Sequence, residues 1–168
     1  MRFKKERTIL TIIMFIAMLF ATIIVCPKER INNLGIKHYN RNNPKRALAL
    51  FYISAIKGYC LAINNVGVLY VEGEGIKPNY KKAHAFFKLS KKRCNAAISY
   101  YNTASLYATG RGVEKSYETA YELYTTAKNT AIEQSILGLP MLCDSALETI
   151  ETYKGISVLR IVEVISSR

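Results

Sequence analysis

The chain has 168 residues, half of them hydrophobic, and carries 24 Lys and Arg against 12 Asp and Glu. This length leaves room for one domain. Residues 28–93 hold 14 basic and 3 acidic side chains, whereas residues 94–168 hold 6 and 8. Such an excess favours an acidic partner or an anionic membrane surface, or is simply a solvated basic face. No arginine-rich run or reading helix accompanies the charge, so we expect no nucleic-acid partner.

Residues 1–26 have the composition of a signal peptide or a signal-anchor transmembrane segment. Four basic residues in MRFKKER precede TILTIIMFIAMLFATIIV, which holds 18 residues without a charge. That length is at the short end of what spans a bilayer. No Ala-x-Ala site follows, so we favour an uncleaved anchor over residues 8–25. Cleavage stays open, as does lipidation at Cys26, although Val25 stands where a lipoprotein signal has a small residue.

The body, residues 27–130, repeats one pattern three times. The segments YVEGEGIKPNYKKAHAFF (Tyr70–Phe87) and YATGRGVEKSYETAYELY (Tyr107–Tyr124) place Tyr, Gly-x-Gly, Tyr, Ala and an aromatic at the same spacing. The segment INNLGI, which begins at residue 31, matches INNVGV, which begins at residue 63. A period of this length is typical of a helical solenoid. We expect the units to cover about residues 28–58, 59–94 and 95–130.

Each unit is interpreted as two helices joined by a turn. The second helices carry a small residue and an aromatic four positions later: Ala47/Phe51, Ala83/Phe87 and Ala120/Tyr124. Gly73 and Gly110 are placed to end the first helices in a left-handed conformation, and Asn79 and Ser116 to cap the second helices. A phosphate-binding glycine loop follows a buried strand, whereas these glycines follow amphipathic helices. We therefore expect no nucleotide site.

These residues resemble the Sel1-like repeat family, helical hairpins related to tetratricopeptide repeats. The second unit carries the family pattern at Ala62, Val66, Gly67, Tyr70, Gly73, Gly75, Ile76, Lys82, Ala83, Phe86, Phe87 and Ser90. The third carries it at Tyr107, Gly110, Gly112, Val113, Ala120, Leu123, Tyr124 and Ala127, with Thr103 and Ala104 in place of Leu-Gly. The first lacks Gly-x-Gly. The resemblance implies an all-α fold, a short right-handed α-solenoid of about three hairpins. The apolar run of residues 8–25 would precede it as a hydrophobic helix.

Residues 131–168 are expected to form capping helices over the last open hydrophobic face. Pro140 falls where a fourth unit would have the Leu of Leu-Gly, and it would break that helix. The segment ISVLRIVEVI, residues 156–165, is rich in β-branched residues, so a strand stays open beside the helix that we expect.

Few residues suggest chemistry. The body cysteines, Cys60, Cys94 and Cys143, form no C-x-x-C, so we expect small buried apolar side chains and no metal site. Whether any two of them form a disulfide stays open. We expect His38 to pack in the core and His84 to lie on the surface. No serine lies in a nucleophile elbow. The chain is predicted to be no enzyme and to need no cofactor.

A partner-binding surface is expected on the concave side, which first helices line in such solenoids. The residues off the core stripe there are Asn32, Asn33, Asn64, Asn65, Val68, Tyr100, Tyr101, Asn102 and Ser105. Amide groups donate and accept hydrogen bonds, and phenol rings give rigid contact area, so both suit recognition. The alternative is that the asparagines pack between neighbouring repeats.

Together these patterns predict an adaptor that binds another protein, acidic in view of the charge. We expect it at a bacterial inner membrane facing the periplasm, or periplasmic or secreted if the N-terminal segment is cleaved. An alternative from the resemblance is an immunity or inhibitor protein that neutralises a toxic effector enzyme. A hydrolase acting on envelope material is a weaker alternative.

Overall fold

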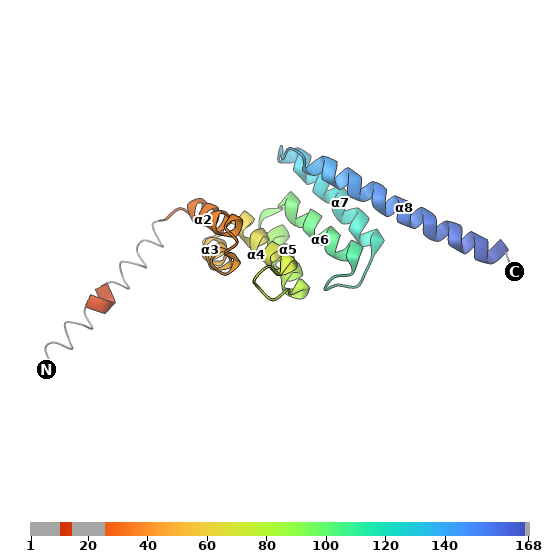
Figure 1. Ribbon diagram of the computed structural model, residues 1–168. Helices are drawn as coiled ribbons and strands as arrows, with labels where there is room; N and C mark the ends of the chain where they lie inside the picture. Colours follow the sequence, from red (N-terminus) through yellow and green to blue (C-terminus); the bar gives the residue numbers. More distant parts are fainter. Residues whose placement is uncertain (1–10, 15–25, 167–168) are drawn as a thin grey trace.

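The computed structural model describes the backbone of residues 11–14 and 26–166, and side chains up to residue 154 within those ranges. The body is a row of stacked helical hairpins (Figure 1). Its helices are α2 (Lys28–Asn40), α3 (Pro44–Ile56), α4 (Cys60–Glu72), α5 (Tyr80–Cys94), α6 (Ala97–Thr109), α7 (Tyr117–Glu133) and α8 (Leu139–Ser166). The expected α-solenoid is confirmed.

The hydrophobic helix expected at residues 8–25 lies outside the described residues except for residues 11–14, which are helical. Within the part of the chain that the structure describes, no helix combines the length and the apolar character needed to cross a bilayer.

The glycine turns have the conformations that the repeat pattern predicts. Gly73 and Gly110 end α4 and α6 with φ of 71° each, in the left-handed region. Asn79 Oδ1 accepts a hydrogen bond from the main-chain N–H of Lys82 at 2.9 Å, and Ser116 Oγ accepts one from that of Thr119 at 3.1 Å. The left-handed residue closes the first helix, and the cap satisfies a free N–H at the start of the second.

Each hairpin is held together by an aromatic ring lying against a small residue. A Cβ added to Gly67 would fall 2.7 Å from Phe87 Cδ1, and one added to Gly35 would fall 2.7 Å from Phe51 Cδ1. No real Cβ approaches a ring carbon so closely, so only glycine permits these contacts. The third unit has Ala104 in this place, and it packs in the same cluster as Tyr124.

The C-terminal region is one long helix, α8, where we expected capping helices. Pro140 is its second residue, so no helix of a fourth unit runs through this position, and the proline lies in the first turn of α8 instead. Proline is tolerated in a first turn because an N–H there has no intrahelical acceptor. Leu139, Cys143 and Ile150 of α8 are buried in clusters with residues of α6 and α7. The backbone is helical through residues 156–165, as expected.

Two of the body cysteines form a disulfide, which corrects the prediction that all three are apolar fillers. Cys60 is the first residue of α4 and Cys94 the last of α5, and their Cα atoms lie 6.0 Å apart. The two helices run antiparallel in one hairpin, so the start of one meets the end of the other. Cys143 is a free buried thiol, as expected.

Candidate protein-binding groove

Asparagine side chains join the first helices of the three units. Asn65 Nδ2 on α4 donates to Asn32 Oδ1 on α2 at 3.0 Å, and Asn102 Nδ2 on α6 donates to Asn64 Oδ1 on α4 at 2.9 Å. Only 2% of Asn32 and 4% of Asn64 is exposed. The asparagines therefore pack between neighbouring repeats, which is the alternative that the sequence left open. We call these four residues the amide ladder.

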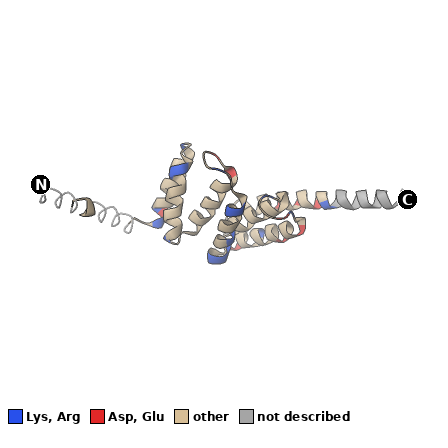
Figure 2. Cartoon of the chain, turned by 90° about the horizontal axis from the view of Figure 1, so that it is seen from below, with Lys and Arg blue, Asp and Glu red and all other residues tan. Residues whose placement is uncertain are grey.

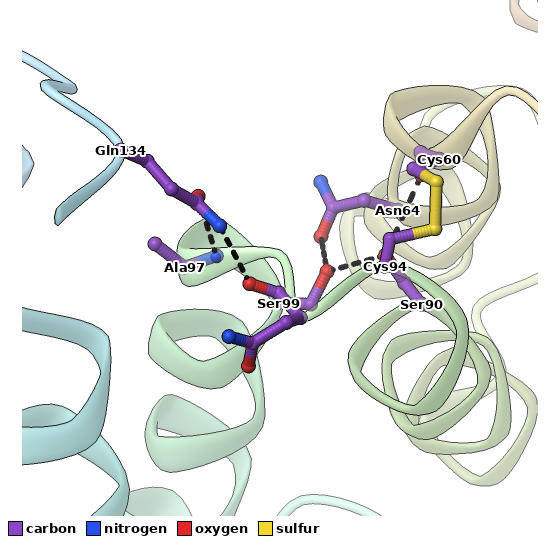
Figure 3. The surroundings of a disulfide bond; sticks show 8 residues. Cys60, Asn64, Ser90, Cys94, Ala97, Ser99 and Gln134 are labelled. Atoms are coloured by element: carbon purple, nitrogen blue, oxygen red, sulfur yellow. Dashed lines mark hydrogen bonds between the residues drawn. A yellow bond between two sulfur atoms is a disulfide. The ribbon is translucent and has the colours of Figure 1, made fainter. Parts of the chain in front are cut away.

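A buried polar cluster continues the amide ladder toward the disulfide (Figure 3). Ser99 Oγ lies 3.2 Å from Asn64 Oδ1 and 2.7 Å from Ser90 Oγ, and Ser90 Oγ donates to the main-chain oxygen of Cys60 at 3.4 Å. No fully buried side-chain nitrogen or oxygen within the described ranges lacks a hydrogen-bond partner. The cluster thus fixes α4, α5 and α6 relative to one another.

Beside the amide ladder lies an open groove of about 770 Å³. Its floor is formed by α2, α4 and α6, and its end wall by the α7–α8 turn and the start of α8. No residue that lines it is charged: Asn32, Ile36, Leu61, Asn64, Asn65, Ile98, Ile136, Leu137, Gly138, Leu139 and Leu142. Leu61, Leu137 and Leu142 are 47%, 97% and 54% exposed. The groove presents apolar side chains to water next to amide groups, an arrangement common in binding sites.

Three of the nine residues predicted to bind a partner line this groove: Asn32, Asn64 and Asn65. Val68 and Asn65 also line a smaller hollow of about 250 Å³ between α2 and α4. Asn33 is exposed outside both hollows.

The remaining four predicted residues lie on α6 and make contacts within the body. Tyr100 donates its hydroxyl to Asn95 Oδ1 at 3.0 Å, and the Tyr101 ring centroid lies 5.2 Å from that of Tyr124. Asn102 belongs to the amide ladder, and the main-chain oxygen of Ser105 accepts a bond from Thr109 Oγ1 at 2.7 Å. Partner binding by any of the nine residues stays a prediction.

The apolar walls are what sequence reasoning missed. Ile98 stands 37 residues after Leu61, so the two occupy the same position in consecutive units and could have been found by aligning them. Leu137 and Leu142 come from the α7–α8 turn, where the repeat pattern has ended. Nothing in the sequence indicated that this turn folds back against the first helices. Gln134 holds it there, donating from Nε2 to the main-chain oxygen of Asn95 at 2.8 Å.

The shifted pKa values in the body have structural causes. Burial, with Lys91 and Lys88 nearby, lowers the pKa of His84, whose ring centroid lies 5.8 Å from that of Tyr107. His84 is thus half-buried and not on the open surface that we expected, because α5 turns this side chain toward α6. The hydrogen bond from Tyr39 to Glu72, at 2.8 Å, raises the pKa of Tyr39 to about 12. Across the described residues, no three His, Cys, Asp or Glu side chains gather as a metal site.

Comparison with known proteins agrees with this architecture. The Sel1 repeat model matches residues 33–59, 60–93 and 97–129, more than half of the chain. A protective antigen present in uropathogenic Escherichia coli strains, with an SLR fold, is similar with a TM-score of 0.64 and 20% identity. That match covers 75% of this chain and 26% of the antigen.

A Sel1 repeat protein from Oxalobacter formigenes is similar with a TM-score of 0.55 and 22% identity, over 66% of this chain and 49% of that one. No curated protein matches the chain. The chain thus spans about a quarter and about half of these two structures. Sel1 repeat proteins generally mediate protein–protein interactions and are typically non-enzymatic scaffolds. The three matched repeats and the stacked hairpins establish that this chain belongs to the Sel1 repeat family.

Proposed function

We propose that this protein is a non-enzymatic adaptor that holds a segment of a partner protein in the uncharged groove. The observation that carries the proposal is the lining of eleven residues without a charge, in which leucine side chains stand exposed beside the amide ladder. Exposed apolar side chains gain free energy when a partner covers them.

The lining also selects the chemistry of the bound segment. A charged side chain placed against Leu61, Ile98 and Leu142 would lose its hydration without gaining an ion pair, which is costly. An uncharged, largely apolar segment fits, with its main-chain groups available to the half-buried amide of Asn65. The basic side chains lie outside the groove, so the groove itself does not favour an acidic ligand.

We place this adaptor at the bacterial envelope, facing the periplasm. The uncharged run of residues 8–25 supports export or anchoring. The Cys60–Cys94 disulfide is independent support, because disulfides persist in oxidising compartments and are rare in the cytosol.

Two leucines provide a matched test. Leu61 lies in the groove with 47% exposed, and Leu34 lies on α2 outside it with 46% exposed. Full-length protein carrying Leu61→Lys or Leu34→Lys is used to capture partners from a detergent extract, followed by cross-linking and mass spectrometry. We expect Leu34→Lys to retain the wild-type partners and Leu61→Lys to lose them by about tenfold or more, because an unpaired charge would enter the interface.

If both variants captured the same partners in equal amounts, the groove would not be the binding site. Several envelope proteins that depend on Leu61 indicate an adaptor. A single stoichiometric toxic enzyme would indicate the immunity role instead.

A further inference from the structure

One long edge of the solenoid carries the turns that join one helical hairpin to the next. It consists of the start of α2 and the α3–α4, α5–α6 and α7–α8 turns, which we call the turn edge: residues 28–30, 56–61, 91–96 and 132–142. The start of α2, the start of α6 and the α7–α8 turn face the same side in Figure 1.

Specific bonds hold these segments in a row. Ser54 Oγ, near the end of α3, donates to the main-chain oxygen of Lys28 at 2.7 Å. The disulfide joins Cys60 to Cys94, and Gln134 Nε2 donates to the main-chain oxygen of Asn95. The turn edge is therefore a continuous, cross-linked surface.

Large apolar side chains project from the turn edge into water. Ile56 is 82% exposed, Leu137 97% and Met141 76%. Single exposed apolar residues are ordinary on a protein surface, but several on one edge mark an interaction site. Ile56 comes from the end of α3, whereas Leu137 and Met141 come from the α7–α8 turn and the start of α8, so two separate segments of the edge carry them.

Cations stand between these apolar side chains. The turn edge carries six basic residues and two acidic ones: Lys28, Arg30, Lys57, Lys91, Lys92, Arg93, Glu29 and Glu133. None of Lys91, Lys92 and Arg93 forms an ion pair with a carboxylate of the described residues. Burial, with Lys88 nearby, lowers the pKa of Lys91. In Figure 2 basic residues gather in the N-terminal and middle parts of the body and are sparse along α8.

We propose that the turn edge docks on an anionic lipid bilayer, with Ile56, Leu137 and Met141 entering the interface and the cations contacting headgroup phosphates. Apolar side chains interleaved with Lys and Arg are the composition of interfacial membrane-binding surfaces. The charge of the edge is complementary to such a surface and would steer it there.

The chain connection favours a bilayer over an acidic protein as the occupant. The uncharged run of residues 8–25 ends three residues before Lys28, where α2 begins on the turn edge. If that run enters a bilayer, the turn edge is the part of the body nearest to the headgroups. The groove would then open beside the membrane, since Leu61 and Leu137 belong to both surfaces.

The protein contains no tryptophan, so a single one reports on its own position. Met141→Trp places the probe on the turn edge, and Thr109→Trp places it at the end of α6, on the opposite edge. Both residues are exposed and both changes leave the net charge unaltered. The full-length variants are reconstituted at equal bound amounts into vesicles of phosphatidylglycerol or of phosphatidylcholine, each containing brominated lipid, and tryptophan emission is recorded.

We expect emission at position 141 to shift to shorter wavelength and to be quenched about threefold more in phosphatidylglycerol than in phosphatidylcholine, because the anionic surface draws the edge inward. Emission at position 109 should resemble that in water with both lipids. A water-like, unquenched emission at position 141 with both lipids would overturn the proposal. So would a response to soluble polyglutamate but not to vesicles, which would assign the edge to an acidic protein.

A pair of charge reversals tests the cations separately. The double variant Lys92→Glu, Arg93→Glu should abolish the lipid-dependent quenching at position 141. The control, Lys45→Glu with Arg46→Glu, changes the charge equally at the start of α3, away from the turn edge, and should retain the quenching. Quenching that survives the first pair would rule out recognition through these cations. Circular dichroism confirms folding of each variant. None of these residues lines the groove, so a failure of this test leaves the proposed groove untouched.

Discussion

The two long edges of the solenoid are built by the same repeat and yet differ in what they carry. The glycine edge (residues 41–43, 73–79 and 110–116) fits closely against neighbouring units. A Cβ on Gly112 would fall 2.6 Å from the main-chain carbon of Tyr80, and one on Gly75 would fall 2.8 Å from Pro44 Cγ. On the turn edge, Gly58 and Gly138 have positive φ but nothing within 4 Å of an added Cβ.

The exposed apolar side chains divide the same way. Within the described residues, the large hydrophobic side chains that are most exposed in the body lie on the turn edge, and none lies on the glycine edge. The difference teaches that packing between units constrains the glycine edge and leaves the turn edge free to serve binding. If the glycine edge is kept and the turn edge varies, one architecture can present many different surfaces.

The largest effect on stability is expected when a glycine on the glycine edge, compared with one on the turn edge, is replaced by alanine. Gly112→Ala combines a strained left-handed residue with an overlap against the backbone of α5, so we expect a loss of about 4 kcal/mol in the free energy of unfolding. Gly58→Ala has the strain alone and should lose about 1 kcal/mol. Urea denaturation of both variants gives the comparison, and equal losses would contradict the distinction between the edges.

Removing the disulfide should rank next. The Cys60–Cys94 bond closes a loop with a sequence separation of 34, so the Cys60→Ser, Cys94→Ser variant should lose about 3 kcal/mol. The same urea experiment on oxidised and reduced wild-type protein should reproduce this loss. Unchanged stability in both experiments would mean that the bond does not restrain the middle hairpin.

A smaller effect is expected from the amide ladder. Asn64→Ala leaves Asn102 Nδ2 without its acceptor and removes one of the two acceptors of Ser99 Oγ, and the expected loss is about 2 kcal/mol, since these groups lie in a largely buried contact. Asn33→Ala, on the exposed side of α2, should change stability by less than about 0.5 kcal/mol. Similar values for both variants would show that the ladder contributes nothing beyond the hairpins.

The last prediction concerns the rate at which the free cysteines are labelled and involves no change in stability. Burial and the neighbouring Asp144 raise the pKa of Cys143 to about 11, so at pH 8 almost all of this thiol is protonated and unreactive. We expect iodoacetamide to modify half-buried Cys26 and to leave Cys143 unmodified until urea is added. Rapid modification of Cys143 in native protein would mean that the start of α8, beneath the exposed side chains of the turn edge, is loosely packed.

Most of the fold was predictable because the same structural residues recur at the same positions in successive repeats. The glycine pairs at positions 73, 75, 110 and 112, and the aromatics at Phe51, Phe87 and Tyr124, agree in register, so one unit checks another. The course of α8 was not predictable in this way, since the pattern stops before it. There Pro140 looked like a breaker, and only the position of the helix start decides whether proline breaks or begins a helix.

The binding surface was predicted less well, and for a physical reason. Asparagines on a first helix satisfy their amides either with a partner or with the next repeat, and the sequence does not tell which. In the structure Asn64 bonds to Ser99 and Asn102, whereas the exposed surface consists of leucines such as Leu61 and Leu137. Apolar residues are expected in a core by default, so their exposure becomes visible only when the neighbouring helices are in place.

The bond between Cys60 and Cys94 also sets how the molecule would respond to tension. If the chain were pulled from a membrane at one end and a bound partner at the other, the first and third hairpins could unravel fully. The middle one could not, because the covalent loop shortens the extensible chain by about 12 nm, at roughly 3.6 Å for each enclosed residue. The middle hairpin, with the central part of the groove, would therefore be the last part of the scaffold to give way under load.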